Sequence, residues 1–186
     1  MSKVLVVVDM QNDFIDGSLG SKEAVAIVQK VQEKIQNGGY DKVIFTMDTH
    51  EENYLETAEG KKLPVKHCIK DTEGWKISDQ ITAGRDMESI NKLMEKTEDK
   101  KFFSTIVGKK TFGYTGWDEF IEDGDTVDII GLCTDICVVS NALIIKAMFP
   151  ENEITVDAAC CAGVTPETHT AALTTMKSCQ INVINE

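Results

Sequence analysis

Continuous apolar runs alternate along this chain with segments whose apolar residues recur every three or four positions. The first run, Val4-Leu5-Val6-Val7-Val8, is mostly β-branched, which is typical of a strand buried on both faces of a parallel sheet. The same reasoning predicts further strands at Val43–Met47, Phe102–Val107, 126–131, Ile154–Val156 and Ile181–Ile184. A turn is expected at Ala158–Gly163, after the fifth of these strands.

Helical spacing separates these runs. Between the first two strands, Val25, Ile27, Val28, Val31 and Ile35 recur near the helical period, and the glycines of Asn37-Gly38-Gly39 stop the pattern. We predict helices at 22–36, 86–98, 117–121, 135–149 and Pro166–Ser178, and a long irregular loop over 51–78. A loop of that length in a compact domain is usually functional or disordered.

Strands that alternate with helices predict an α/β fold. We expect a doubly wound, mostly parallel, six-stranded sheet with helices on both faces and right-handed crossovers. The chain has only three prolines and shows neither a Gly/Ser linker nor a repeat, so residues 1–186 are expected to form a single domain.

Charge and composition narrow the setting. A formal net charge of −12 argues against nucleic acid and anionic membranes as partners. No apolar run approaches the roughly 20 residues of a membrane span, and Met1 to Val4 leads straight into a core strand, so we expect a cytoplasmic protein without a signal peptide. Without an export signal we expect the six cysteines to form no disulfides, and their spacing matches no Cys-only zinc site.

Three groups that can carry chemistry follow three different strands: Asp9, a lysine at 109 or 110, and Cys137. The carboxyl ends of parallel strands meet at one edge of a sheet, where ligands bind. A lysine there would stabilise a thiolate, and a carboxylate could take the thiol proton and return it to a leaving amine. The sequence therefore predicts a nucleophilic thiol site at this edge.

Cys137 is the candidate nucleophile because it lies where a strand passes into a helix. The backbone N–H groups and the helix dipole at such a position lower a thiol pKa and favour the thiolate. The backbone N–H groups of Cys133 and Cys137 could form an oxyanion hole in the same turn. The alternative interpretation of Cys137 is a small buried hydrophobic residue.

A second set of side chains can bind metal. Asp48 and His50 follow the second strand, and His67 could add a ligand from the long loop. The alternative is that both histidines are ordinary surface residues.

Two long motifs resemble those of a known family. The segments Val6-Val7-Val8-Asp9-Met10-Gln11-Asn12-Asp13-Phe14 and Gly131-Leu132-Cys133-Thr134-Asp135-Ile136-Cys137-Val138 are similar to the opening and nucleophile motifs of the isochorismatase-like cysteine hydrolases. Asp48-Thr49-His50 and Pro64-Val65-Lys66-His67-Cys68 resemble metal-binding segments of its nicotinamidase branch. The likeness runs over nearly the whole chain.

The resemblance implies roles for individual residues. It implies a catalytic triad of Asp9, Lys109 and Cys137, with Lys109 preferred over Lys110 because the family's lysine usually lies three residues before an aromatic, here Phe112. It also implies a cis peptide bond before Thr134. The implied metal ligands are Asp48, His50 and His67 with Glu59, or Glu56 as the second choice, around a divalent ion, with zinc preferred and iron or manganese as alternatives.

The resemblance further implies a metal-assisted amidohydrolase for a small amide, nicotinamide first, which forms a thioester and serves pyridine nucleotide salvage. Phe14 would line the ring pocket, and the family is often homo-oligomeric. Pro64 stands where well-characterised nicotinamidases often have an aromatic, and Trp75 is expected to replace part of that wall. The alternative is a cysteine amidase for another small amide, a ureido compound or an N-carbamoyl compound.

Overall fold

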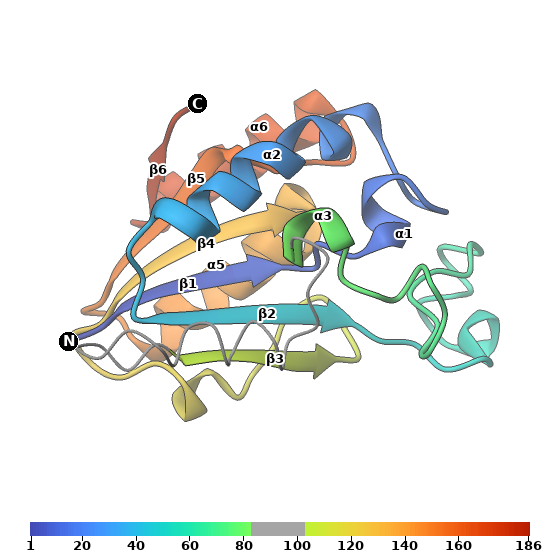
Figure 1. Ribbon diagram of the computed structural model, residues 1–186, viewed down its shortest axis with the longest axis horizontal. Coiled ribbons are helices and arrows are strands. Elements are labelled where there is room, and N and C mark those ends of the chain that lie inside the picture. Colours follow the sequence, from blue (N-terminus) through green and yellow to red (C-terminus); the bar gives the residue numbers. More distant parts are fainter. Residues whose placement is uncertain (83–102) are drawn as a thin grey trace.

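All the strands that the structure describes are parallel, whereas the sequence predicts a mostly parallel sheet. The computed structural model describes residues 1–82 and 103–186, and within them six parallel strands lie in the order β3-β2-β1-β4-β5-β6 (Figure 1). The strands are β1 (Lys3–Val8), β2 (Lys42–Asp48), β3 (Phe103–Lys109), β4 (Thr126–Leu132), β5 (Glu153–Ala162) and β6 (Asn182–Ile184). The predicted doubly wound α/β class is confirmed.

The centre of the sheet is the β-branched run that opens the chain. Val4–Val8 is fully buried in β1, between β2 on one side and β4 on the other. A strand with apolar side chains on both faces is stable only where both faces are covered, and this composition therefore fixes β1 in the interior of the sheet.

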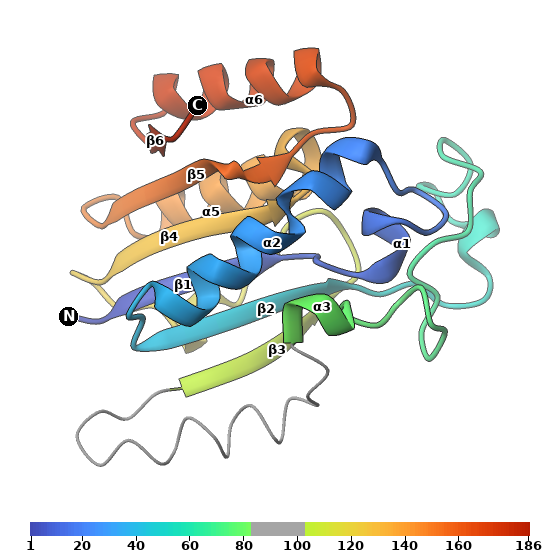
Figure 2. The ribbon, with the colours of Figure 1, turned by 45° about the horizontal axis from the view of Figure 1, so that its top comes forward.

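Helices cover both faces. They are α1 (Asn12–Ile15), α2 (Lys22–Asn37), α3 (Asp79–Thr82), α5 (Val139–Met148) and α6 (Pro166–Ser178), with short turns η1 (Tyr54–Glu56), η2 (Trp117–Glu119) and the π-helical η3 (Thr134–Val138). One apolar cluster joins the sheet to α1 and α2, and a second joins it to α5 and α6. Figure 2 shows α2 in front of the sheet and α5 behind it.

The order of the strands locates the site. The chain runs outward from β1 through β2 to β3 and then returns to the other side of β1 as β4, so the order reverses between β1 and β4. Ligands of open α/β sheets bind at the carboxyl ends of the strands beside such a reversal. Asp9 and Cys137 follow these two strands.

Several predicted elements differ from the observed ones. β5 continues through the turn predicted at Ala158–Gly163, because pairing with β4 holds this run of small residues extended despite its weak strand preference. The helix predicted at 135–149 begins with the π-helical turn η3. The predicted helix 86–98, and Phe102 of the third strand, lie outside the described residues. Within the described residues, no helix has the length and apolar character to cross a membrane.

Candidate active site

The side chains of Asp9, Lys109 and Cys137 meet at the carboxyl ends of β1, β3 and β4. Lys109 Nζ lies 2.6 Å from Asp9 Oδ2 and 3.5 Å from Cys137 Sγ. Lys109 reaches them because it is the last residue of β3 and pairs in parallel register with Asp48 of β2. Lys110, the alternative that the sequence leaves open, is exposed.

Backbone and side-chain contacts hold Asp9 in place. Its φ of +46° lies in the left-handed region, which a residue other than glycine adopts only when its surroundings fix it. The Asp9 N–H donates to the Thr46 carbonyl at 3.2 Å, and the Thr46 hydroxyl donates to Asp9 Oδ1 at 2.6 Å. Thr46 therefore occupies one carboxylate oxygen and leaves the other toward Lys109.

Burial governs the protonation of the group. It raises the pKa of the Asp9 carboxyl, with the Lys109 ammonium opposing the shift. Burial and the charge of Asp9 raise the pKa of the Cys137 thiol well above its ordinary value, again opposed by Lys109. The lowered thiol pKa that we predicted from the helix start is not found, because Cys137 is only 4% exposed and faces a carboxylate. The resting thiol keeps its proton, and the adjacent carboxylate can receive it.

The turn that carries Cys137 depends on one glycine. Gly131 near the end of β4 has a φ of +118°, and a Cβ there would lie 2.1 Å from the Val8 carbonyl oxygen, so no other residue fits. The cis peptide bond joins Leu132 to Cys133, one residue earlier than the bond before Thr134 that the resemblance implies. The observed position is the point where the chain leaves β4, which ends at Leu132.

Hydrogen bonds of Cys133 and Asn141 shape the turn from inside. The Cys133 carbonyl accepts hydrogen bonds from the N–H groups of Ile136 and Val138, at 3.1 and 3.0 Å. Asn141 donates to the Cys137 carbonyl at 2.8 Å and accepts from the Tyr114 N–H at 2.9 Å. These bonds fix the turn to the start of α5 and to the loop after β3. The two proposed oxyanion-hole residues, Cys133 and Cys137, lie four positions apart within it.

Four side chains beside this group could hold a metal ion. Asp48, His50, Glu59 and His67 each offer a ligand atom, and the four atoms lie within 4.8 Å of one another. His50 Nε2 lies 3.0 Å from Asp48 Oδ2, and His67 Nε2 lies 3.6 Å from the same oxygen. Glu56, the second choice for the fourth ligand, is exposed and outside the group.

The chemistry of these donors fits a divalent cation. His67 Nδ1 lies 2.8 Å from the Val65 carbonyl oxygen, a bond that puts the ring proton on Nδ1 and leaves the Nε2 lone pair free to ligate. In the described part of the chain, the buried His50 Nε2 has no hydrogen-bond partner, as a ligating nitrogen requires. Two imidazoles and two carboxylates are a ligand set that zinc, iron and manganese accept.

The opening motif also positions the metal-binding segments, which the sequence did not reveal. The Gln11 side chain donates to the Asp48 carbonyl at 2.9 Å and accepts from the Asp48 N–H at 2.8 Å, so it fixes the end of β2. Asp13 accepts from the Cys68 N–H at 2.7 Å and thereby anchors the loop next to His67. In the sequence, only their place in the opening motif marks Gln11 and Asp13. Side chains that bond to the backbone follow no periodic pattern that would reveal them.

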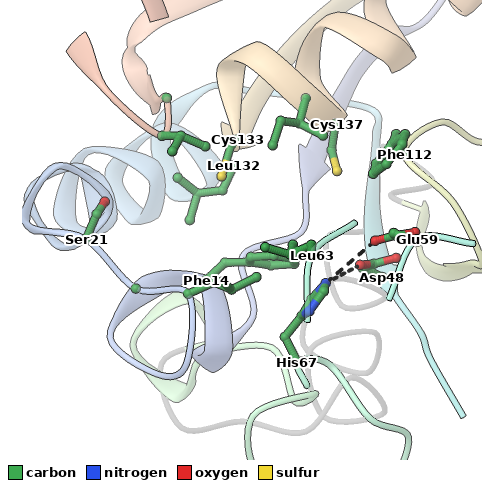
Figure 3. A pocket seen from close by; sticks show the side chains of 15 residues that line it. Phe14, Ser21, Asp48, Glu59, Leu63, His67, Phe112, Leu132, Cys133 and Cys137 are labelled. Atoms are coloured by element: carbon green, nitrogen blue, oxygen red, sulfur yellow. Dashed lines mark ion pairs between the residues drawn. The ribbon is translucent and has the colours of Figure 1, made fainter. Parts of the chain in front are cut away.

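An apolar cavity of about 410 Å³ opens onto both groups. Figure 3 shows Cys137, Asp48 and Glu59 at one end and Ser21 at the other, with Phe14 between them. Leu63 and Phe112 line the cavity, and neither was predicted. The cavity has the size and apolar character of a small-molecule site.

Trp75 is not one of the described residues that line this cavity, contrary to our expectation. Its indole N–H donates to the Thr49 hydroxyl at 2.9 Å, and its ring is only partly buried against the core on the α2 face. The side chain is therefore held against Thr49, and Leu63 and Phe112 line the cavity instead.

Fold and site together define a doubly wound α/β protein with a buried thiol, ammonium and carboxylate beside a candidate metal centre. The chain belongs to the isochorismatase family, since the Isochorismatase domain matches residues 3–186.

The chain is similar to known proteins over most or all of its length. It is 25% identical to the nicotinamidase of Saccharomyces cerevisiae, an alignment that covers 99% of this chain and all of that protein. It is 31% identical to an uncharacterised isochorismatase family protein of Bacillus subtilis over 77% of this chain and 78% of that one. The crystal structure of the Pyrococcus horikoshii pyrazinamidase in complex with zinc has a TM-score of 0.73 and 26% identity, with 99% of both chains covered.

Proposed function

We propose that this protein is a metal-assisted cysteine amidohydrolase that converts nicotinamide and water to nicotinate and ammonia. One observation carries the proposal: Asp9, Lys109 and Cys137 converge beside a candidate metal centre at one end of a single apolar cavity. The likeness to nicotinamidases and pyrazinamidases supports the same substrate class.

In the proposed reaction, Asp9 takes the proton of the Cys137 thiol while the sulfur attacks the carboxamide carbon. Burial raises the pKa of the Cys137 thiol and of the Asp9 carboxyl, so the thiol keeps its proton at rest and the carboxylate is a base that can take it. Lys109 stays charged, since the Asp9 carboxylate raises its pKa against the effect of burial, and it stabilises the developing negative charge.

The intermediate collapses with a proton from Asp9. The backbone N–H groups of Cys133 and Cys137 are the proposed donors to the oxyanion. Asp9 returns its proton to the departing nitrogen, ammonia leaves, and a thioester remains on Cys137. Water then hydrolyses the thioester, which releases the carboxylic acid and restores the thiol.

Asp48, His50, Glu59 and His67 are the proposed ligands of the divalent ion. Zinc is our first choice, with iron or manganese as alternatives, because all three accept nitrogen and oxygen ligands. When bound, the ion supplies a Lewis acid for the ring nitrogen of the substrate. Phe14 packs against His67, with ring centroids 5.5 Å apart, and would hold the substrate ring flat at this end of the cavity.

The shape of the cavity favours a second candidate, a larger neutral carboxamide. The cavity continues past Leu132 and Cys133 to Ser21, beyond the end at which the amide reacts (Figure 3). Among the described residues that line it, none is Lys or Arg to receive the carboxylate of an N-carbamoyl amino acid. Charged carbamoyl compounds are therefore less favoured than uncharged aromatic amides.

Ammonia release tests the proposal. We expect the purified protein to release ammonia from nicotinamide and pyrazinamide faster than from N-carbamoyl amino acids. Cys137→Ala should fold normally and release none, while Cys179→Ala, which removes an exposed cysteine, should match the wild type. Ammonia release from Cys137→Ala at the wild-type rate would refute the assignment of the nucleophile.

We further propose that the enzyme works in the cytoplasm and as a homo-oligomer. The six cysteines are free, which supports a reducing compartment. Sedimentation velocity would measure the oligomeric state directly, and a monomer at micromolar concentration would contradict this part of the proposal.

A further inference from the structure

His169 is the one histidine of the chain outside the candidate metal centre. It lies on α6, far in sequence from the residues discussed so far, and its ring is partly buried. Its Nδ1 lies 2.8 Å from the hydroxyl oxygen of Thr134. This contact joins α6 to the turn that carries the nucleophile.

Thr134 occupies the position between the two candidate oxyanion-hole residues, directly after Cys133. It is fully buried, and His169 is the partner of its hydroxyl in the described structure. The next residue, Asp135, accepts a hydrogen bond from the Val164 N–H at 3.0 Å. Two consecutive side chains of the turn are therefore attached to α6 and to the segment just before it.

The start of α6 is itself held rigidly. Thr165 caps the helix in a reciprocal capping box with Thr168, and Pro166 occupies the first turn. A Cβ on Gly163 would lie 2.8 Å from the Cβ of His169, so only glycine lets β5 end this close to the helix. His169 thus presents its ring to Thr134 from a fixed base.

We propose that His169 is a positioning residue, whose hydrogen bond to Thr134 sets the orientation of the turn and hence of the Cys133 and Cys137 N–H groups. This inference rests on the proposed function. His169 does not line the cavity, so substrate binding should be little changed when it is replaced. Its loss should act on the attack step, because misplaced donors stabilise the oxyanion poorly.

Because Nδ1 is the nitrogen that contacts Thr134, two substitutions of His169 test the role of this contact. An asparagine at 169 places a polar atom near the position of Nδ1, whereas a glutamine places one near Nε2. We expect His169→Gln to lower kcat for nicotinamide about 10-fold or more with KM within about twofold. His169→Asn should recover most of the loss. Thr170→Val, which removes an exposed hydroxyl from the same helix, is the matched control.

A second readout does not require turnover. The Cys137 thiol can add to the carbonyl of an aromatic aldehyde such as nicotinaldehyde. The sulfur bonds to the carbonyl carbon, and the thiol proton moves to the oxygen. That oxygen then sits where the oxyanion forms. His169→Gln should weaken this inhibitor about 10-fold, and Thr134→Val should do the same, with no further loss in the double variant.

The outcomes separate the two proposals. A wild-type protein that releases no ammonia from any carboxamide overturns the proposed function. An active wild type with His169→Gln at the same kcat and the same affinity for the aldehyde overturns the role of His169. Equal losses in His169→Asn and His169→Gln, with unfolding midpoints lowered alike, would also overturn it, because a merely structural role predicts that pattern.

Discussion

Lys109 Nζ lies 2.6 Å from Asp9 Oδ2, and each of the two side chains is at most 1% exposed to solvent. Neither charge could remain there alone, since an uncompensated ion in the protein interior costs several kcal/mol. Burial raises the pKa of the Asp9 carboxyl and the Lys109 ammonium opposes that shift, so the pair places beside the thiol a carboxylate that is a stronger base than an exposed one.

Removal of the ammonium should affect both folding and chemistry. Lys109→Met leaves Asp9 buried without its cation, and we expect the free energy of unfolding to fall by about 3 kcal/mol and ammonia release to fall by at least about 100-fold. Denaturant titration and initial rates measure the two effects. Lys110→Met is the control because Lys110 is exposed, and equal effects in the two variants would contradict the assignment of Lys109.

The reactivity of Cys137 should rise with pH. Since burial and Asp9 raise the pKa of the thiol well above its ordinary value, only a small fraction is thiolate at pH 7, and this fraction increases as the pH rises. We expect the rate of alkylation of Cys137 by iodoacetamide to climb up to at least about pH 9 without a plateau. Peptide mapping resolves Cys137 from the exposed Cys179. A plateau below pH 7 would mean that the thiolate is the resting form.

Metal content should distinguish the two glutamates of the long loop. Glu59→Gln removes a proposed ligand and should lower metal affinity at least about 10-fold, whereas Glu56→Gln should leave it unchanged, because Glu56 is exposed and outside the group. His67→Ala should lose the ion almost completely. Elemental analysis after dialysis against a chelator measures all three. Full retention of the metal by Glu59→Gln would exclude that ligand.

The wall of the cavity should be sensitive at Phe14 and Phe112 and insensitive at Trp75. Phe14→Ala and Phe112→Ala remove apolar surface from the cavity, and we expect KM for nicotinamide to rise about 10-fold in each. Trp75→Phe should change KM by less than about twofold, because the indole bonds to Thr49 and does not line the cavity. A large rise in KM for Trp75→Phe alone would restore the interpretation that the sequence favoured.

The sequence predicts this fold well where composition alone determines the element. The β-branched run of β1 can be stable only as a buried parallel strand, and the periodic α2 begins at a serine cap and ends before glycine. It predicts β5 poorly, because Ala158 to Ala162 has small side chains that pair with β4 without any alternation of their own. Contacts between distant segments decide such stretches.

The candidate site likewise contains features that the sequence predicts and features that it does not. The ends of strands predict Asp9 and Cys137 as candidate site residues, because the topology brings those ends together. The raised thiol pKa and the link from His169 to Thr134 depend instead on burial and on a neighbouring helix, and neither leaves a pattern in the sequence. Trp75 illustrates the reverse error: an aromatic residue near the site turns toward a hydroxyl of the scaffold, while Leu63 and Phe112 form the wall.

The central claim is that Cys137 attacks the carbonyl carbon of a neutral aromatic carboxamide. Acid quenching during turnover of nicotinamide, followed by mass spectrometry of the digested protein, tests it most directly. We predict a nicotinoyl thioester on the peptide that contains Cys137, and none in Asp9→Asn, which cannot take the thiol proton. Steady ammonia release from the wild type with Cys137→Ala equally active and no acyl adduct on Cys137 would contradict it.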